Sequence, residues 1–89
     1  MITFEDDDVR YLAWRADHST GLVVNHRRPA RPGYLLLHRL PCIALGTEPA
    51  NGGSWTHLNA KRCSTQRVEL ERWALTVGGA LQPCRLCKP

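Results

Sequence analysis

Two segments of the chain carry apolar residues at the i, i+3, i+4 and i+7 spacing of an amphipathic helix. The first segment contains Val9, Leu12, Ala13 and Ala16, and the second contains Leu70, Trp73, Ala74 and Val77. Acidic residues favour a helix start before the first segment, and Ser64 is a good N-cap before the second. Gly21 and Gly78 can end the two helices in a left-handed conformation. The pattern therefore predicts two helices, one towards each end of the chain.

Short apolar and β-branched runs between these helices favour strands at residues 22–24, 34–38 and 43–45, with a weaker alternation over 55–63. The first two runs are expected to pair as an antiparallel hairpin, because the loop between them contains two prolines and a glycine. The predicted fold class is α+β, a small domain with two helices packed on a short antiparallel sheet of about three strands. We expect a single domain over residues 1–89, with an acidic N-terminal lead at 1–8 and a C-terminal tail at 80–89.

Four cysteines, Cys42, Cys63, Cys84 and Cys87, offer a way to stabilise this chain of 89 residues. At such a size a hydrophobic core alone leaves only about 3–5 kcal/mol of stability. Cys84 and Cys87 form a Cys-x-x-Cys pair that can occupy two corners of a tetrahedron, which leaves Cys42 and Cys63 for the other two. We therefore predict a structural Zn²⁺ site formed by the four cysteines. The expected fold is then a small zinc-stabilised domain with a metal-tied C-terminal tail at 80–89.

Three alternatives to the four-cysteine zinc site stay open. His38 or His57 can replace one cysteine ligand. The cysteines can instead form disulfides, as in small secreted domains, or remain free or redox-active thiols. However, the N-terminus is acidic and lacks the basic and apolar regions of a signal peptide, and no segment is long enough to span a membrane. We therefore expect a reducing, cytoplasmic location, where cysteines bind metal more readily than they pair.

The charged residues are unevenly distributed along the chain. Half of the eight acidic residues fall within residues 5–8, and the segment 18–47 contains none. Ten of the twelve basic residues are arginine, whose planar guanidinium makes paired hydrogen bonds with phosphate and with guanine. We predict nucleic-acid contacts from Arg27, Arg28, Arg31, Arg39, Lys61 and Arg62, with Trp55 stacking on a base.

The sequence contains no convincing catalytic constellation. Asp17, His18 and Ser19 are consecutive, so they cannot converge as acid, base and nucleophile. A zinc ion held by four cysteines has no open coordination position for a reacting water. We therefore expect a non-enzymatic module that binds duplex DNA rather than single strands, with no small-molecule substrate and no membrane partner. The alternative is a zinc-stabilised adaptor whose basic face binds an acidic protein partner.

Several short segments carry a resemblance to a known family: Tyr11-Leu12-Ala13-Trp14, Gly21-Leu22-Val23-Val24-Asn25, Tyr34-Leu35-Leu36-Leu37-His38-Arg39, Glu69-Leu70-Glu71-Arg72-Trp73-Ala74 and the four cysteines. From about Asp7 to Cys87 the chain resembles a small bacterial domain found in the N-terminal part of HNH-type restriction nucleases and in short stand-alone proteins. The resemblance implies DNA recognition without cleavage, in a restriction or regulatory context, with the nuclease in a separate module that can act in trans. It leaves open whether a modified base such as methylated cytosine is recognised.

Overall fold

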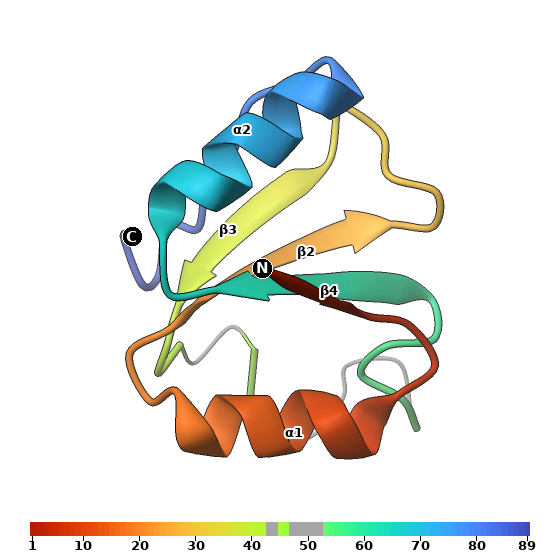
Figure 1. Ribbon diagram of the computed structural model, residues 1–89, viewed down its shortest axis with the longest axis vertical. Helices are drawn as coiled ribbons and strands as arrows, with labels where there is room; N and C mark the ends of the chain where they lie inside the picture. Colours follow the sequence, from red (N-terminus) through yellow and green to blue (C-terminus); the bar gives the residue numbers. More distant parts are fainter. Residues whose placement is uncertain (43–44, 47–52) are drawn as a thin grey trace.

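The computed structural model describes residues 1–42, 45–46 and 53–89. Its elements follow the order β1 (Ile2–Phe4), α1 (Asp8–Asp17), β2 (Leu22–Arg27), β3 (Leu35–Arg39), β4 (Asn59–Ser64), α2 (Arg67–Val77) and β5 (Gln82–Pro83). Figure 1 shows the sheet as the middle layer, with α1 against one face and α2 against the other. The predicted α+β class with two helices is confirmed. In the described part of the chain, neither helix combines the length and the apolar character needed to cross a membrane.

The sheet has five strands, where the sequence predicts about three. Its order is β1-β4-β2-β3-β5, and every neighbouring pair is antiparallel except β3 with β5. β1 has three residues and β5 has two, which is too short to show an alternating pattern, so each depends on pairing with a longer strand. The predicted β2–β3 hairpin is confirmed, with residues 22–26 paired to 35–39. The prediction was therefore wrong about the two edge strands and about the purely antiparallel sheet.

Two further predicted strands differ from the structure. β4 begins at Asn59, and residues 55–58 form bends before it rather than extended strand. Of the strand predicted at 43–45, residues 43 and 44 lie outside the described residues, and Leu45 lies in a turn. The weak alternation over 55–63 therefore marks a real strand only in its second half.

Helix α1 is present as predicted, but it buries a different face. Its first turn is capped by the Asp7 carboxylate, which accepts a hydrogen bond from the Arg10 backbone N–H at 3.2 Å. Tyr11 is fully buried, whereas Val9 is 82% exposed and Leu12 is 42% exposed. Trp14 is half-buried on the same side as Tyr11 and packs against the core. Because an aromatic ring buries about 150–250 Å², these two rings decide which side of the helix meets the sheet.

Helix α2 buries the predicted face, whose four residues are all buried or half-buried: Leu70, Trp73, Ala74 and Val77. Its N-terminus differs from the prediction, because Ser64 is the last residue of β4 and Gln66 is the N-cap. The Ser64 hydroxyl instead organises the connecting turn by accepting from the Gln66 N–H and donating to Glu69. Gly78 ends the helix with a φ of 88°, in the left-handed region that favours glycine.

The sheet separates two apolar clusters. The cluster on the α1 side contains Phe4, Tyr11, Val23, Leu40, Cys42, Leu45, Cys63 and Cys84. The cluster on the α2 side contains Val24, Leu35, Leu37, Leu70 and Ala74. Successive residues of a strand face opposite sides of a sheet, so Val23 and Val24 belong to different clusters. Three of the four cysteines thus lie in the core on the α1 side.

Candidate metal centre

Four side chains that can ligate a metal meet at the end of the β3–β5 pair: His38, Cys42, Cys84 and Cys87. His38 lies near the end of β3, and Cys42 follows it by four residues. β5 runs parallel to β3 with Leu37 opposite Pro83, and the Cys84 N–H donates to the Leu37 carbonyl at 2.9 Å. This pairing places the turn from Cys84 to Cys87 beside His38.

The distances within the cluster fit tetrahedral coordination. Its four donor atoms all lie within 4.8 Å of one another. The sulfurs of Cys42 and Cys84 are 3.9 Å apart, and the Cys42 sulfur is 3.6 Å from Nδ1 of His38. A tetrahedral zinc ion with usual bond lengths would set these separations at about 3.8 Å and about 3.5 Å. The arrangement of the donors is therefore compatible with one bound metal ion.

The cluster is shielded from water and supported by backbone hydrogen bonds. His38, Cys42 and Cys84 are only 3%, 5% and 6% exposed, and Cys87 is half-buried. The Arg39 N–H donates to the Cys87 sulfur at 3.2 Å, and the Leu86 N–H donates to the Cys84 sulfur at 3.4 Å. N–H groups directed at sulfur stabilise the thiolate form that binds metal.

The electrostatic environment separates the pKa values of the donors. Burial, and then the charge of Lys61, lowers the pKa of His38 to about 4, so its imidazole is neutral at pH 7. Burial opposes ionisation of Cys84, but backbone N–H groups of Cys87 and Leu86 outweigh it and lower the pKa of this thiol. Burial and the neighbouring thiols raise the pKa of Cys87 to about 11. A bound cation would favour the thiolate at every cysteine of the cluster.

Cys63, the remaining predicted ligand, is not part of this cluster. It lies in β4 opposite Val23, and Val23 in turn lies opposite His38 in β3. Neighbouring strands are about 4.8 Å apart, so Cys63 is roughly 10 Å from His38. Cys63 is fully buried, and burial raises its pKa to about 12. It is therefore a neutral core side chain inside β4 and not a ligand of this cluster.

Of the two histidines considered as replacements, only His38 joins the cluster. His57 is exposed, and its Nδ1 lies 2.6 Å from the carboxylate of Asp6. The sequence signal for His38 is its distance from Cys42, since pairs of zinc ligands on one turn are typically separated by two to five residues. The donor set is Cys₃His, with no position left open once all four donors are bound.

Comparisons with protein-family models, with curated proteins and with solved structures find no significant match to this chain. The resemblance to HNH-type accessory domains therefore stays a prediction. The geometry of the His38, Cys42, Cys84 and Cys87 cluster is compatible with a bound metal ion.

Several of the residues predicted to contact nucleic acid are engaged inside the molecule. Arg28 forms ion pairs with Asp6 at 3.0 Å and with Glu5 at 3.6 Å. Lys61 is only 7% exposed, and its Nζ donates to Asn25 at 2.6 Å and to the Trp55 carbonyl at 2.7 Å. These contacts make both basic residues part of the internal structure.

Two more of the predicted contact residues belong to aromatic packing. Trp55 is half-buried, with its ring centroid 6.0 Å from that of Tyr11 and the Arg15 guanidinium 5.0 Å away. Arg62 lies over the Trp73 ring at 4.2 Å. Both Trp55 and Trp73 are therefore half-buried and already in contact with a cationic side chain.

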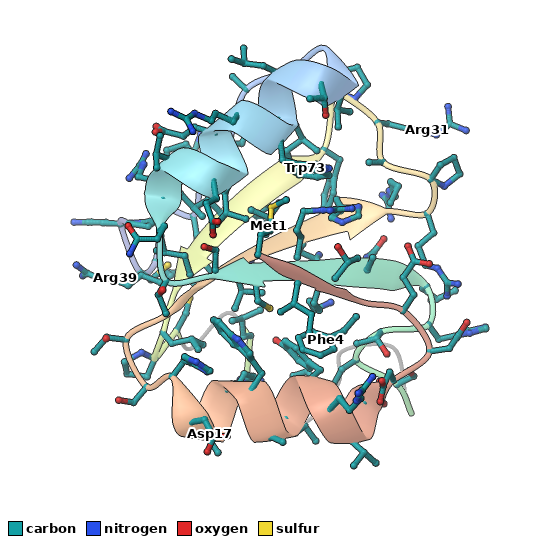
Figure 2. All side chains as sticks on the ribbon, in the orientation of Figure 1. Met1, Phe4, Asp17, Arg31, Arg39 and Trp73 are labelled. Atoms are coloured by element: carbon teal, nitrogen blue, oxygen red, sulfur yellow. The ribbon has the colours of Figure 1, made fainter. Side chains whose placement is uncertain are left out.

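The other three predicted contact residues, Arg27, Arg31 and Arg39, are exposed but do not form one surface. Arg39 pairs with Leu22 at the start of β2, and Arg27 is the last residue of β2. At about 3.3 Å per residue, the two ends of this strand are roughly 17 Å apart. Figure 2 shows Arg31 and Arg39 on opposite sides of the molecule. Sequence reasoning missed Arg85 and Lys88, which are exposed beside the metal cluster, although their positions flanking Cys84 and Cys87 are a usable signal.

Proposed function

We propose that this chain is a zinc-stabilised module that binds duplex DNA without cleaving it. The observation that carries the proposal is that the N-terminal acidic side chains have partners within the molecule, whereas several exposed basic side chains lack an acidic partner. The acidic residues at positions 5–8 make contacts within the molecule, whereas the exposed bases Arg27, Arg31, Arg39, Arg85 and Lys88 take part in none of the ion pairs among the described residues.

The N-terminal acids illustrate this difference. Glu5 and Asp6 pair with Arg28, and Asp7 caps α1. The Asp8 carboxylate accepts hydrogen bonds from Thr56 and from its neighbours in the 54–56 segment. A net charge of +4 is therefore presented to solvent mainly as positive surface, which attracts polyanions such as nucleic acid.

Zinc is the metal that best suits the cluster. Cys₃His is a common zinc donor set, and thiolate ligands in tetrahedral geometry favour zinc over magnesium or calcium. Four protein donors close the coordination sphere, so the ion would have a structural role and no position for a hydrolytic water. The module is accordingly proposed to be non-catalytic.

Duplex DNA suits the surface better than a single strand. Sequence-tolerant binding of single strands depends on aromatic faces on which bases can stack. All three tryptophans are half-buried and in contact with other side chains. Trp14, for example, stacks on His18 with ring centroids 4.3 Å apart. Exposed arginines can contact duplex phosphates without such a platform. The resemblance to restriction-nuclease accessory domains extends the proposal to a restriction or regulatory context with a nuclease acting in trans.

The test combines metal analysis with binding at varied salt. We expect one zinc per chain in the purified protein, and a binding constant for a short duplex that falls linearly with salt on logarithmic axes, by about 0.9 per phosphate contacted. Matched methylated and unmethylated duplexes report whether a modified base is recognised. Absence of binding to duplex at low salt would reject the proposed function, as would a clear preference for single strands.

A second candidate is a zinc-stabilised adaptor that binds an acidic protein. It is favoured by exposed apolar side chains, since Leu75 is 74% exposed and Leu86 is 62% exposed. Leu75 also borders a shallow groove beside α2, lined by Arg67, Glu71, Leu75, Gly79, Ala80 and Leu81. The two candidates differ in what copurifies with the protein. Nucleic acid that high salt removes, detected as an elevated ultraviolet absorbance ratio, supports the DNA-binding module.

A further inference from the structure

Three exposed basic residues lie around the metal cluster: Arg39, Arg85 and Lys88. We call them the metal-end bases. Arg85 lies within the Cys84–Cys87 turn, Lys88 follows it directly, and Arg39 follows the ligand His38 on β3. Every metal-end base is thus adjacent in the chain to at least one donor of the cluster. The position of this surface depends on the same turn that supplies the ligands.

Hydrogen bonds connect the metal-end bases to the ligand turn. The Arg39 N–H donates to the sulfur of Cys87 at 3.2 Å, and its guanidinium donates to the Cys87 carbonyl at 3.3 Å. The Lys88 N–H donates to the Cys84 carbonyl at 3.0 Å, which closes the turn around Arg85. Bringing β3 and the ligand turn together therefore gathers three positive charges that come from positions far apart in the sequence.

No carboxylate within the described part of the chain pairs with a metal-end base. A zinc ion with three thiolates and a neutral histidine would carry a charge of about −1, which leaves a positive surplus in the surrounding surface. The hairpin tip is different, because its Arg28 is paired with Glu5 and Asp6. These two carboxylates offset positive charge at the tip, whereas no described carboxylate pairs with the metal-end bases, so the metal end is the better place for a polyanion to bind.

We propose that the metal-end bases, rather than the hairpin tip, form the principal contact with DNA phosphates. This inference rests on the proposed function and places the DNA contact at one end of the molecule. The occupant is the sugar–phosphate backbone of duplex DNA, since positively charged, exposed side chains on a rigid turn match a regular array of phosphates. Metal binding and DNA binding are then coupled, because the ion holds Arg85 and Lys88 in position against Arg39.

The experiment compares salt dependence between two groups of charge-removing variants of the zinc-loaded protein. The metal-end variant combines Arg39→Gln, Arg85→Gln and Lys88→Gln, and the tip variant combines Arg27→Gln with Arg31→Gln. Removing one phosphate contact should lower the slope of log K against log salt by about 0.9, so we expect a fall of about 2–3 for the metal-end variant and less than about 1 for the tip variant. Arg72→Gln, at an exposed arginine on α2, measures the effect of removing one positive charge elsewhere on the molecule.

Metal content and circular dichroism check that every variant keeps its fold. If Arg39→Gln impairs metal binding, the Arg85→Gln/Lys88→Gln pair carries the test. The described hydrogen bonds around the cluster involve no side-chain atom of Arg85 or Lys88, and Lys88 contributes only its backbone N–H. The expected fall in slope for this pair is about 2.

Three outcomes would count against this inference. The reverse pattern, with a reduced slope in the tip variant and an unchanged slope in the metal-end variant, would overturn it but leave the proposed function intact. Competition by polyglutamate as effective as that by DNA of equal charge would also overturn it, in favour of an acidic protein partner. Absence of any DNA binding by the unmodified protein would overturn both.

Discussion

His38 and Cys63 provide the sharpest test of the metal centre at the level of single residues. His38 supplies a donor atom 3.6 Å from the Cys42 sulfur, whereas Cys63 lies across Val23 in β4. Changes around a ligand already reduce metal affinity by about 10–100-fold, so His38→Ala should reduce zinc affinity by more than about 100-fold. Cys63→Ala should keep one zinc per chain, with its affinity changed by less than about threefold and a loss of about 1–2 kcal/mol in stability from the small cavity.

These affinities can be measured by competition with a chromophoric chelator, and the zinc content by elemental analysis after dialysis. Both variants replace one side chain by alanine, so each is the control for the other. Loss of zinc from Cys63→Ala, with zinc retained in His38→Ala, would contradict the Cys₃His assignment and restore the four-cysteine site.

Lys61 makes the stability of the protein depend on pH. Burial lowers the pKa of its ammonium group from 10.5 to about 8. Between these values the unfolded chain binds a proton that the folded protein does not, so stability rises with pH from about 8 to about 10.5. Below pH 8 the buried charge destabilises the fold fully, by about 3 kcal/mol if the whole shift is realised. Lys61→Met removes this dependence.

The measurement is the difference in unfolding free energy between the unmodified protein and Lys61→Met, determined by denaturant titration at pH 7 and at pH 10. Other titrating groups affect both proteins and largely cancel in this difference. The unfolding free energy of the unmodified protein should rise relative to that of Lys61→Met as the pH increases from 7 to 10. A difference that stays constant between the two pH values would show that Lys61 keeps an ordinary pKa in the folded state.

At the level of secondary-structure elements, Asp8 connects the start of α1 to the segment that leads into β4. Its carboxylate accepts from the Thr56 hydroxyl at 2.7 Å, from the Thr56 N–H at 2.9 Å and from the Trp55 N–H at 3.0 Å. Asp8→Asn replaces one acceptor oxygen by a donor, so we expect a loss of about 2–3 kcal/mol. Thermal or denaturant unfolding measures it, and Asp17→Asn, an exposed position on the same helix, should change stability by less than about 0.5 kcal/mol.

The hydrogen bonds of the Asp8 carboxylate also predict how the stability of the protein changes at low pH. Burial opposes ionisation of Asp8, but hydrogen bonds from Thr56, Trp55 and Ser54 outweigh it and lower its pKa below the ordinary 3.8. The stabilisation is therefore present above pH 3.8 and is lost as the pH falls through the lower folded-state pKa. Asp8→Asn should lack this loss, and equal acid sensitivity in both proteins would argue against the role of this carboxylate.

The sequence predicts the long elements better than the short ones. Leu70 and Ala74 identify the buried face of α2 because buried residues recur every three to four positions along a helix. β1 and β5 contain too few residues to show an alternating pattern of apolar and polar residues. They are strands because β1 pairs with β4 and β5 pairs with β3. In α1 the spacing of the aliphatic residues correctly predicted a helix but did not identify its buried face. The helix instead buries the side that carries Tyr11 and Trp14, because their aromatic rings bury more area.

At the level of the whole molecule, the metal site depends on strand register rather than on spacing along the chain. Three of the four predicted cysteines come together, and His38 occupies the place expected for Cys63. Counting cysteines cannot reveal that Val23 lies between Cys63 and His38, because the register of three strands determines it. The Cys84–Cys87 pair was recognisable because its geometry is local, within a single turn.

The arrangement of the whole molecule also explains why the sequence prediction did not include Arg85 and Lys88. The acid-free segment correctly located exposed arginines on the β2–β3 hairpin, but a hairpin has two ends and its arginines lie at both. Arg85 and Lys88 join Arg39 only because β5 pairs with β3 in parallel. A basic cluster assembled by long-range pairing has no signature in the local sequence.

The parallel pairing of β5 with β3 also joins donors that are synthesised at different times. Cys42 and Cys84 are 42 residues apart, so two donors leave the ribosome well before the other two. At about 5–20 residues per second, this interval lasts roughly 2–8 seconds. During that time the helices and the central strands can form while a metal ion would have only two protein donors. Tight binding by all four donors would therefore come after the folding of the scaffold that it stabilises.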